Sequence, residues 1–147
     1  MFVWAFLTKN LSAHYAHHGE SSVPCVSNLG LLCAKKDLTV NDILYMTEEP
    51  DDFKGCMTEN YVNIQLTING YRTYYWESER GAEIDFVIQK EGHLIPIAVK
   101  SADNTRAKSL KVYMQTYHPV YAVKLSAGNF GFENNIKTVP LYAAFCL

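Results

Sequence analysis

Two apolar segments separated by a short polar turn constrain the fold of this chain more than any other feature of its sequence. Residues 82–88 (AEIDFVI) alternate between apolar and polar side chains, and residues 94–101 (LIPIAVKS) are almost continuously apolar. The QKEGH segment between them contains a glycine and reads as a tight turn. The pattern therefore predicts two neighbouring strands that pair antiparallel.

Because side chains alternate along a strand, each of these segments should have two faces. In the second segment, Lys100 is expected on the same face as Ala98. In the first segment, one face is expected to carry Ala82, Ile84, Phe86 and Ile88, and the other Glu83, Asp85 and Val87.

The remaining readable chain supplies helices and further strands around this pair. The best helix covers residues 53–70, where apolar side chains recur at helical spacing and Gly70 is a candidate C-cap. Residues 1–26 give no readable pattern and are set apart from a single domain at 27–147. Further helices are predicted at 28–38 and 104–117, strands at 71–78 and 120–126, and a strand or helix at 138–145. This order predicts an α/β or α+β sheet covered by helices.

Composition narrows the class of protein. The chain has 147 residues, 48% of them hydrophobic and 19% charged, as in a globular protein with one domain. A net charge of −2 excludes the overall basic balance of a dedicated nucleic-acid-binding protein and leaves room for a local basic patch. No apolar run approaches the roughly 20 residues of a membrane span, so no membrane partner is expected. The four cysteines lack CxxC spacing, which favours a reduced, cytoplasmic protein.

Three charged residues fall on the predicted helix and strands in an order that suggests a site. Glu59 lies on the helix 53–70, Asp85 on the first strand of the pair, and Lys100 at the end of the second. This order resembles that of the PD-(D/E)XK nuclease fold, whose core has a helix glutamate, a strand aspartate, and (D/E)-x-K on the next strand. The resemblance implies a restriction-endonuclease-like α/β fold, with a mixed central sheet flanked by helices.

A more specific resemblance covers roughly residues 27–147. The segments that carry it, in order, are FKGCMTENYV, YYWESERGAEIDFVI, IPIAVKS, KSLKVYMQTY and VPLYAAF. Together they look like the domain of unknown function that usually sits C-terminal to an AAA-type ATPase in bacterial and archaeal chains. Two features depart from this pattern: the chain has no GxxxxGK[ST] motif, and Ala98 stands where the nuclease pattern has an acid.

The nuclease resemblance implies a set of chemical roles. Asp85 and an acid at position 98 would hold Mg²⁺ or Mn²⁺, and Glu59 would complete the metal site. Glu83, two residues before Asp85, is the candidate substitute for the missing acid. Lys100 would stabilise the charge that develops on the phosphate. Arg106, Lys108 and Lys111, on the helix that follows, are candidate phosphate contacts.

Three functions remain open on these grounds. The first is a nuclease-fold module that is catalytically inactive because of Ala98 and binds nucleic acid or protein. The second is a metal-dependent DNA nuclease that uses Glu59, Asp85, Glu83 and Lys100. The third is a structural remnant of a longer ATPase chain. The partners considered are therefore DNA, a partner protein and a second copy of the chain.

Each candidate residue also has an ordinary structural interpretation. Lys100 is then a solvated strand end, Asp85 its salt-bridge partner, and Glu59 a surface residue of the helix. The basic helix residues then form a solvated face, and the ten tyrosines are mostly core rather than a stacking platform for bases. The acidic residues Glu77, Glu79 and Glu83 read as a solvated edge, and His14, His17 and His18 as an exposed terminus rather than a metal site.

Overall fold

The computed structural model describes two continuous parts of the chain and a few residues before them. The described residues are 51–100 and 108–147, together with 11–13, 30, 33, 34, 39 and 41. Of these, residues 11–13 and 51–53 are described by their backbone only. The predictions on His14, His17, His18 and Arg106 therefore lie outside the described residues.

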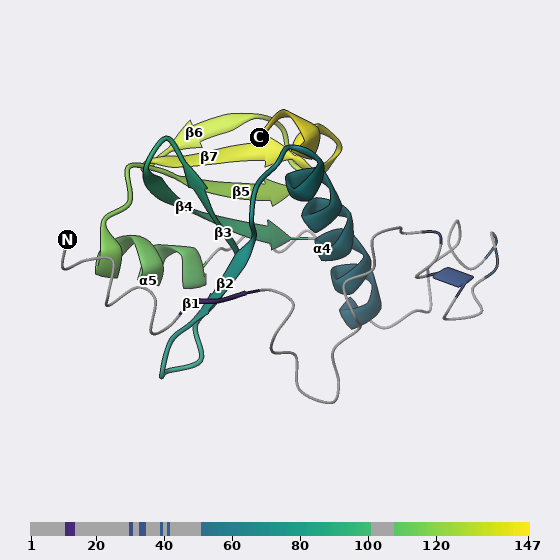
Figure 1. Ribbon diagram of the computed structural model, residues 1–147, viewed down its shortest axis with the longest axis horizontal. Helices are drawn as coiled ribbons and strands as arrows, with labels where there is room; N and C mark the ends of the chain where they lie inside the picture. The colour runs from purple at the N-terminus through teal and green to yellow at the C-terminus, as the bar shows by residue number, and fades with distance from the viewer. Residues whose placement is uncertain are drawn as a thin grey trace.

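A mixed seven-stranded sheet forms the centre of the described structure, in the order β1-β2-β3-β4-β5-β7-β6 (Figure 1). The strands are β1 Leu11–Ala13, β2 Tyr74–Glu77, β3 Glu83–Lys90, β4 His93–Lys100, β5 Ala122–Ser126, β6 Gly131–Glu133 and β7 Ile136–Pro140. Neighbours from β1 to β4 pair antiparallel, β4, β5 and β7 run parallel, and β6 is antiparallel to β7. The helices are α4 Asp51–Ile68, α5 Lys108–Tyr117 and the 3₁₀ helix η1 Leu141–Cys146. The predicted mixed α/β sheet flanked by helices is confirmed.

The predicted hairpin between β3 and β4 is present, with Phe86 opposite Ile97 and Lys90 opposite His93. Its two turn residues both have left-handed backbones, with φ of 52° at Glu91 and 80° at Gly92. Such turns match the right-handed twist of paired strands. The glycine therefore allows the close connection that brings the ends of β3 and β4 together.

Strict alternation along β3 is wrong, because the strand contains an irregularity. Tyr74 and Trp76 of β2 pair with Val87 and Ile84 of β3, so three residue steps on β3 match two on β2. An extra residue of this kind is a β-bulge, and it reverses the facing of the side chains beyond it. Ile84 accordingly packs with Val87, while Phe86 packs in the other core cluster. The bulge includes Asp85.

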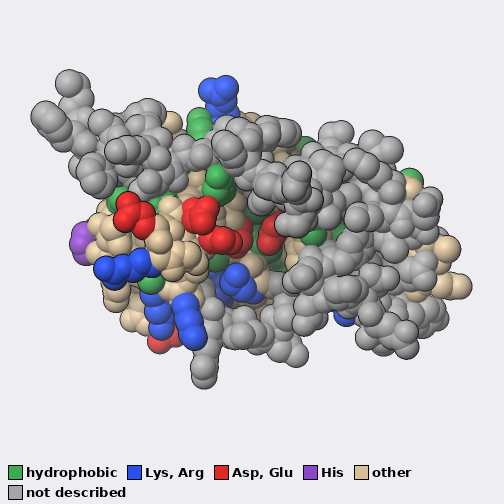
Figure 2. All heavy atoms as spheres, turned by 90° about the horizontal axis from the view of Figure 1, so that it is seen from below, with side chains coloured by type: hydrophobic (Ala, Val, Ile, Leu, Met, Phe, Trp, Pro, Cys, Tyr) green, Lys and Arg blue, Asp and Glu red, His purple; other side chains and the backbone are tan. Residues whose placement is uncertain are grey.

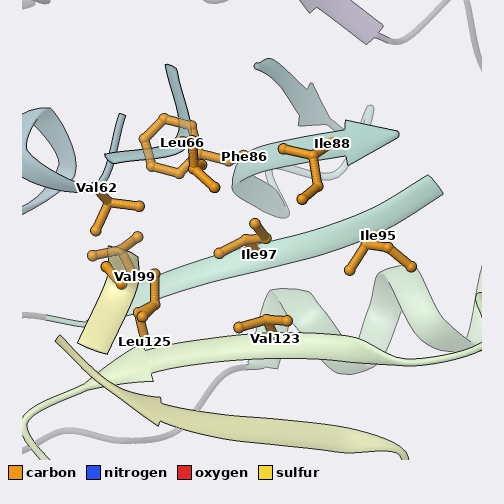
Figure 3. Packing of buried hydrophobic residues seen from close by; sticks show 10 residues of the cluster. Val62, Leu66, Phe86, Ile88, Ile95, Ile97, Val99, Val123 and Leu125 are labelled. Carbon is orange, nitrogen blue, oxygen red and sulfur yellow. The ribbon is translucent and has the colours of Figure 1, made fainter. Parts of the chain in front are cut away.

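The first core cluster lies between α4 and one face of the sheet. Figure 3 shows Val62 and Leu66 of α4 beside Phe86, Ile97 and other side chains of the central strands. α4 ends at a Schellman motif, in which the amides of Gly70 and Tyr71 donate to the carbonyls of Thr67 and Leu66 at 2.9 and 3.0 Å. The predicted C-cap glycine is thus confirmed, with φ of 82°.

The second core cluster lies on the opposite face, where α5 packs against β3 and β4. Leu110 and Tyr113 of α5 contact the face that carries Trp76, and the Trp76 and Tyr113 rings meet edge to face at 5.1 Å. Ala98 belongs to this cluster and Val99 to the first, so α4 and α5 cover opposite faces of one sheet.

The remaining helices and strands predicted from the sequence agree in part with those of the structure. Gly30, Cys33 and Ala34 are helical, inside the helix predicted at 28–38. The last segment is a strand followed by a helix rather than one or the other, since β7 ends at Pro140 and η1 begins at the next residue. No helix among the described residues is long and apolar enough to cross a membrane.

Candidate functional site

Glu59 comes from α4 and is half-buried. The pKa of Glu59 is raised from 4.5 to about 7, mainly by burial and then by the charges of Asp85 and Glu83, against the opposing effect of Lys100. These effects show that Asp85, Glu83 and Lys100 all lie within electrostatic reach of Glu59. Glu59 is therefore half-buried beside other charges rather than fully exposed on the helix.

Asp85 is fixed to the neighbouring strand by its own side chain. The backbone N–H of Val99 donates to its Oδ2 at 2.6 Å. Burial raises the pKa of Asp85, against the opposing effects of that amide and of the Lys100 charge. The bulge in β3 and the end of the β3–β4 ladder at Phe86 place this carboxylate where it can accept from the β4 backbone.

Lys100 is the last residue of β4 and is half-buried. Its charge lowers the pKa of both Glu59 and Asp85, so it is a shared counter-charge. The hydrogen-bond partner of Asp85 is the β4 backbone rather than Lys100, which acts on the carboxylate through space. The simple Asp85–Lys100 salt bridge is therefore not the arrangement that the structure shows.

Glu83 is exposed at the start of β3, opposite Glu77 of β2. Its charge raises the pKa of both Glu59 and Asp85. Figure 2 shows acidic side chains gathered in the middle of one face of the molecule, with a basic side chain beside them. When ionised, the three carboxylates carry more negative charge than the single ammonium balances. Burial is the largest cause of both raised pKa values. At Glu59 the neighbouring carboxylates raise the pKa further than burial alone, whereas at Asp85 the Lys100 charge lowers the pKa more than the Glu83 charge raises it.

The donor set is of the kind that Mg²⁺ and Mn²⁺ prefer, since it consists of carboxylate oxygens. Among the residues that the structure describes, however, no three His, Cys, Asp or Glu side chains are gathered closely enough to form a ready metal cluster. The residues thus fit a divalent cation in chemical type and in charge. They do not form a complete coordination shell by themselves.

Ala98 occupies the position at which the nuclease pattern has an acid. Only 3% of it is exposed, and it packs in the second core cluster with Leu110 and Tyr113. A longer acidic side chain at this position would have to displace apolar neighbours or turn towards the strand end. Ala98 is therefore a packing residue in this chain.

The predicted basic contacts on α5 stand apart from the carboxylates. Lys108 and Lys111 are exposed, and neither is among the charges that act on Glu59 or Asp85. Sequence reasoning also missed a residue close to the site, Lys124 of β5, which lies directly opposite Ala98. The register of two parallel strands joined by a helix cannot be derived from alternation alone.

Comparison with known proteins gives one match. A family model described as a domain of unknown function, DUF4143, matches residues 54–144, more than half of the chain. The match extends from α4 to η1 and includes Glu59, Asp85 and Lys100. No curated protein and no solved structure matches the chain.

Proposed function

We propose that this chain, which belongs to the DUF4143 family, is a nuclease-fold domain that binds nucleic acid and is impaired in cleavage. The observation that carries the proposal is the convergence of Glu59, Asp85 and Lys100 from three separate elements. Two half-buried carboxylates with raised pKa values beside a lysine are typical of functional sites. The order helix glutamate, strand aspartate, strand lysine supports a relationship to PD-(D/E)XK nucleases and their restriction-endonuclease-like fold.

Each residue has a role that follows from its place. Asp85 and Glu59 would hold a divalent cation, which would neutralise phosphate charge and activate a water molecule when bound. Lys100 supplies a fixed positive charge for a phosphate oxygen at the end of β4. Glu59, with a pKa raised to about 7, exchanges a proton readily at neutral pH.

Ala98 supports binding without efficient cleavage. It offers no oxygen donor, and it is buried among apolar side chains. Loss of one fixed electrostatic contact in a catalytic site typically costs on the order of 10²–10³ in rate. Binding of phosphate through lysine depends less on that position, so it would survive the loss of the acid.

A second candidate is a metal-dependent DNA nuclease in which Glu83 replaces the missing acid. The observation that favours it is the charge of Glu83, which raises the pKa of both half-buried carboxylates and so supports a third carboxylate close to the pair. In this alternative Glu59, Asp85, Glu83 and Lys100 act together, and cleavage requires Mg²⁺ or Mn²⁺.

The wider resemblance adds a partner to the proposal. The domains that it resembles usually follow an AAA-type ATPase, and these 147 residues contain no GxxxxGK[ST] motif. We therefore assign any nucleotide-driven step to an associated ATPase rather than to this domain. A role as a protein-binding module or structural remnant would appear as absence of both metal and nucleic-acid binding.

Calorimetric titration of Mn²⁺ tests the metal site in the natural protein, in Ala98→Glu and in the matched control Ala98→Gln. We expect Ala98→Glu to bind Mn²⁺ at least about tenfold more tightly than Ala98→Gln, or about 1.4 kcal/mol, because only the glutamate adds a charged oxygen donor. Since Ala98 is buried, thermal unfolding of each variant must show a folded protein first.

A folded Ala98→Glu that binds Mn²⁺ no better than Ala98→Gln would overturn the metal-site assignment. A DNA-cleavage assay with Mn²⁺ decides between the two candidates. If the natural protein cleaves DNA and Asp85→Asn does not, the second candidate, the metal-dependent nuclease, replaces the first. No cleavage by the natural protein, with DNA binding retained, supports the first.

A further inference from the structure

Lys124 stands beside the position of the missing acid. In the parallel ladder between β4 and β5, Ala98 is opposite Lys124, and Lys100 is opposite Ser126. Residues in register on neighbouring strands direct their side chains to the same face of a sheet. Ala98 and Ala122 both pack in the second cluster, so Lys124, two residues after Ala122, shares that face.

The charge of Lys124 is not used by the carboxylates. Lys100 lowers the pKa of Glu59 and Asp85, and Lys124 is not among the charges that act on either. α5 packs on β3 and β4, and Lys124 of β5 is half-buried. The strand register thus fixes the backbone position of Lys124 opposite Ala98, and its charge does not act on Glu59 or Asp85.

The position also lies where ligands commonly bind in sheets of this kind. Lys100 and Ser126 are the last residues of the parallel strands β4 and β5, which are joined through α5. Open α/β sheets bind ligands outside the carboxyl ends of their parallel strands. Ser126 is fully buried, and its Oγ accepts the N–H of Gly128 at 3.3 Å, which fixes the turn after β5.

We propose that Lys100 and Lys124 form a phosphate-binding pair on either side of Ala98, which contacts the nucleic-acid backbone without a metal ion. Residues one strand across and two positions along lie about 8 Å apart at their Cα atoms, a gap that two lysine side chains bridge around one phosphate. An acid at position 98 would lie opposite Lys124 and neutralise it. Alanine leaves this ammonium for a ligand.

The inference rests on the proposed function only in taking the phosphate from nucleic acid. The test is the anisotropy of a fluorescent single-stranded DNA oligonucleotide, titrated with the protein in EDTA at several salt concentrations. We expect Lys124→Gln to weaken binding about tenfold and to reduce the slope of log affinity against log salt by about 0.7, the value for one phosphate contact on a single strand.

Lys137→Gln is the matched control. Lys137 lies on the neighbouring strand β7, opposite Val123, and its ammonium sits over the Tyr121 ring at 3.9 Å from the centroid. Val123 packs in the first cluster, so Lys137 belongs to the other face. The control removes one positive charge without touching the proposed pair, and we expect the salt slope to stay at that of the natural protein.

The outcomes separate this inference from the proposed function. Three results would each overturn the Lys100–Lys124 pair. The first is equal DNA affinity in Lys124→Gln and in the natural protein. The others are equal losses of affinity in Lys124→Gln and Lys137→Gln, and no DNA binding in EDTA. Mn²⁺ titration of Lys124→Gln reports independently on the carboxylates and should match the natural protein. If no variant binds Mn²⁺ and Lys124→Gln alone weakens DNA binding, the pair stands and the metal site fails.

A phosphate group at this site could come from a polynucleotide or from a free mononucleotide, and a titration with AMP distinguishes the two. AMP is titrated in parallel with the oligonucleotide under the same conditions. DNA affinity at least about tenfold above that of AMP supports a polynucleotide ligand, since further backbone phosphates then contribute. AMP binding as tight as DNA binding would overturn the assignment to nucleic acid.

Discussion

Glu59 has a protonation state that depends on three neighbours and on its burial, and this makes its contribution to stability depend on pH. Its folded pKa of about 7 lies above the ordinary value of 4.5. Below about pH 4.5 the carboxyl is protonated in both the folded and the unfolded chain. As the pH rises towards 7, only the unfolded chain releases the proton, so the free energy of unfolding falls.

We expect Glu59→Gln to remove this loss, because the amide has no charge to bury. The variant should gain stability over the natural protein as the pH rises from about 4.5 to 7, up to about 3 kcal/mol. Urea unfolding at acidic and slightly alkaline pH measures the difference. Glu133→Gln, at an exposed position on β6, is the control. A difference between Glu59→Gln and the natural protein that stays constant with pH would contradict the raised pKa.

The candidate site could be predicted at this scale because its residue types were unusual for their positions. Asp85 lies inside an apolar strand, where a carboxylate needs a partner, and Lys100 ends the next strand. The actual partner of Asp85, the Val99 amide, could not be predicted, because it depends on how the β3–β4 ladder ends. Lys124 was missed because its proximity to Ala98 arises only from the parallel register.

At the scale of elements, α5 is attached to the sheet by the rings of Trp76, Tyr113 and Tyr117, and the two tyrosine hydroxyl groups differ in their hydrogen bonds. Trp76 Nε1 donates to the Tyr117 hydroxyl at 3.2 Å. The Tyr113 hydroxyl is buried and has no hydrogen-bond partner among the described residues, and burial raises its pKa to about 12. The two tyrosines, four positions apart on α5, therefore allow a direct comparison of a hydroxyl group with a hydrogen-bond partner and one without a partner among the described residues.

We expect Tyr113→Phe to stabilise the protein by about 1 kcal/mol, because it removes a buried hydroxyl that lacks a partner. Tyr117→Phe should destabilise it by about 1 kcal/mol, because Trp76 loses its acceptor. Equilibrium unfolding in urea measures both changes. If both substitutions destabilise the protein equally, the Tyr113 hydroxyl has a partner and the assignment is wrong.

The elements themselves were predictable to the extent that local signals fix them. Gly92 and Gly70 mark the β3–β4 turn and the end of α4, and both have left-handed backbones that favour glycine. The bulge in β3 was not predictable from its own sequence, because it is defined by pairing with β2. β6 and the start of β7 were missed because GFE and IKT are too short to show a period.

At the scale of the whole molecule, one sheet carries two separate core clusters, and the candidate site draws residues from both sides. Leu66 of α4 is fully buried in the first cluster and Leu110 of α5 in the second. β3 and β4 contribute side chains to both clusters, for instance Val99 to one and Ala98 to the other. The two cores therefore share their central strands and should unfold together.

We expect Leu66→Ala and Leu110→Ala each to lower the free energy of unfolding by about 2–5 kcal/mol, because each leaves a cavity in its own cluster. The two losses should add within about 0.5 kcal/mol, since the leucines belong to separate clusters on opposite faces of the sheet. Each variant should still unfold in one transition when followed by tryptophan fluorescence and by far-UV circular dichroism. Val112→Ala, at a position of α5 that is 42% exposed, controls for the loss of a branched side chain and should cost less than about 1 kcal/mol.

Two separate transitions in Leu66→Ala would show that α4, and Glu59 with it, can detach while α5 stays folded. The convergence of the site would then depend on a docking equilibrium of α4 rather than on a single folded unit.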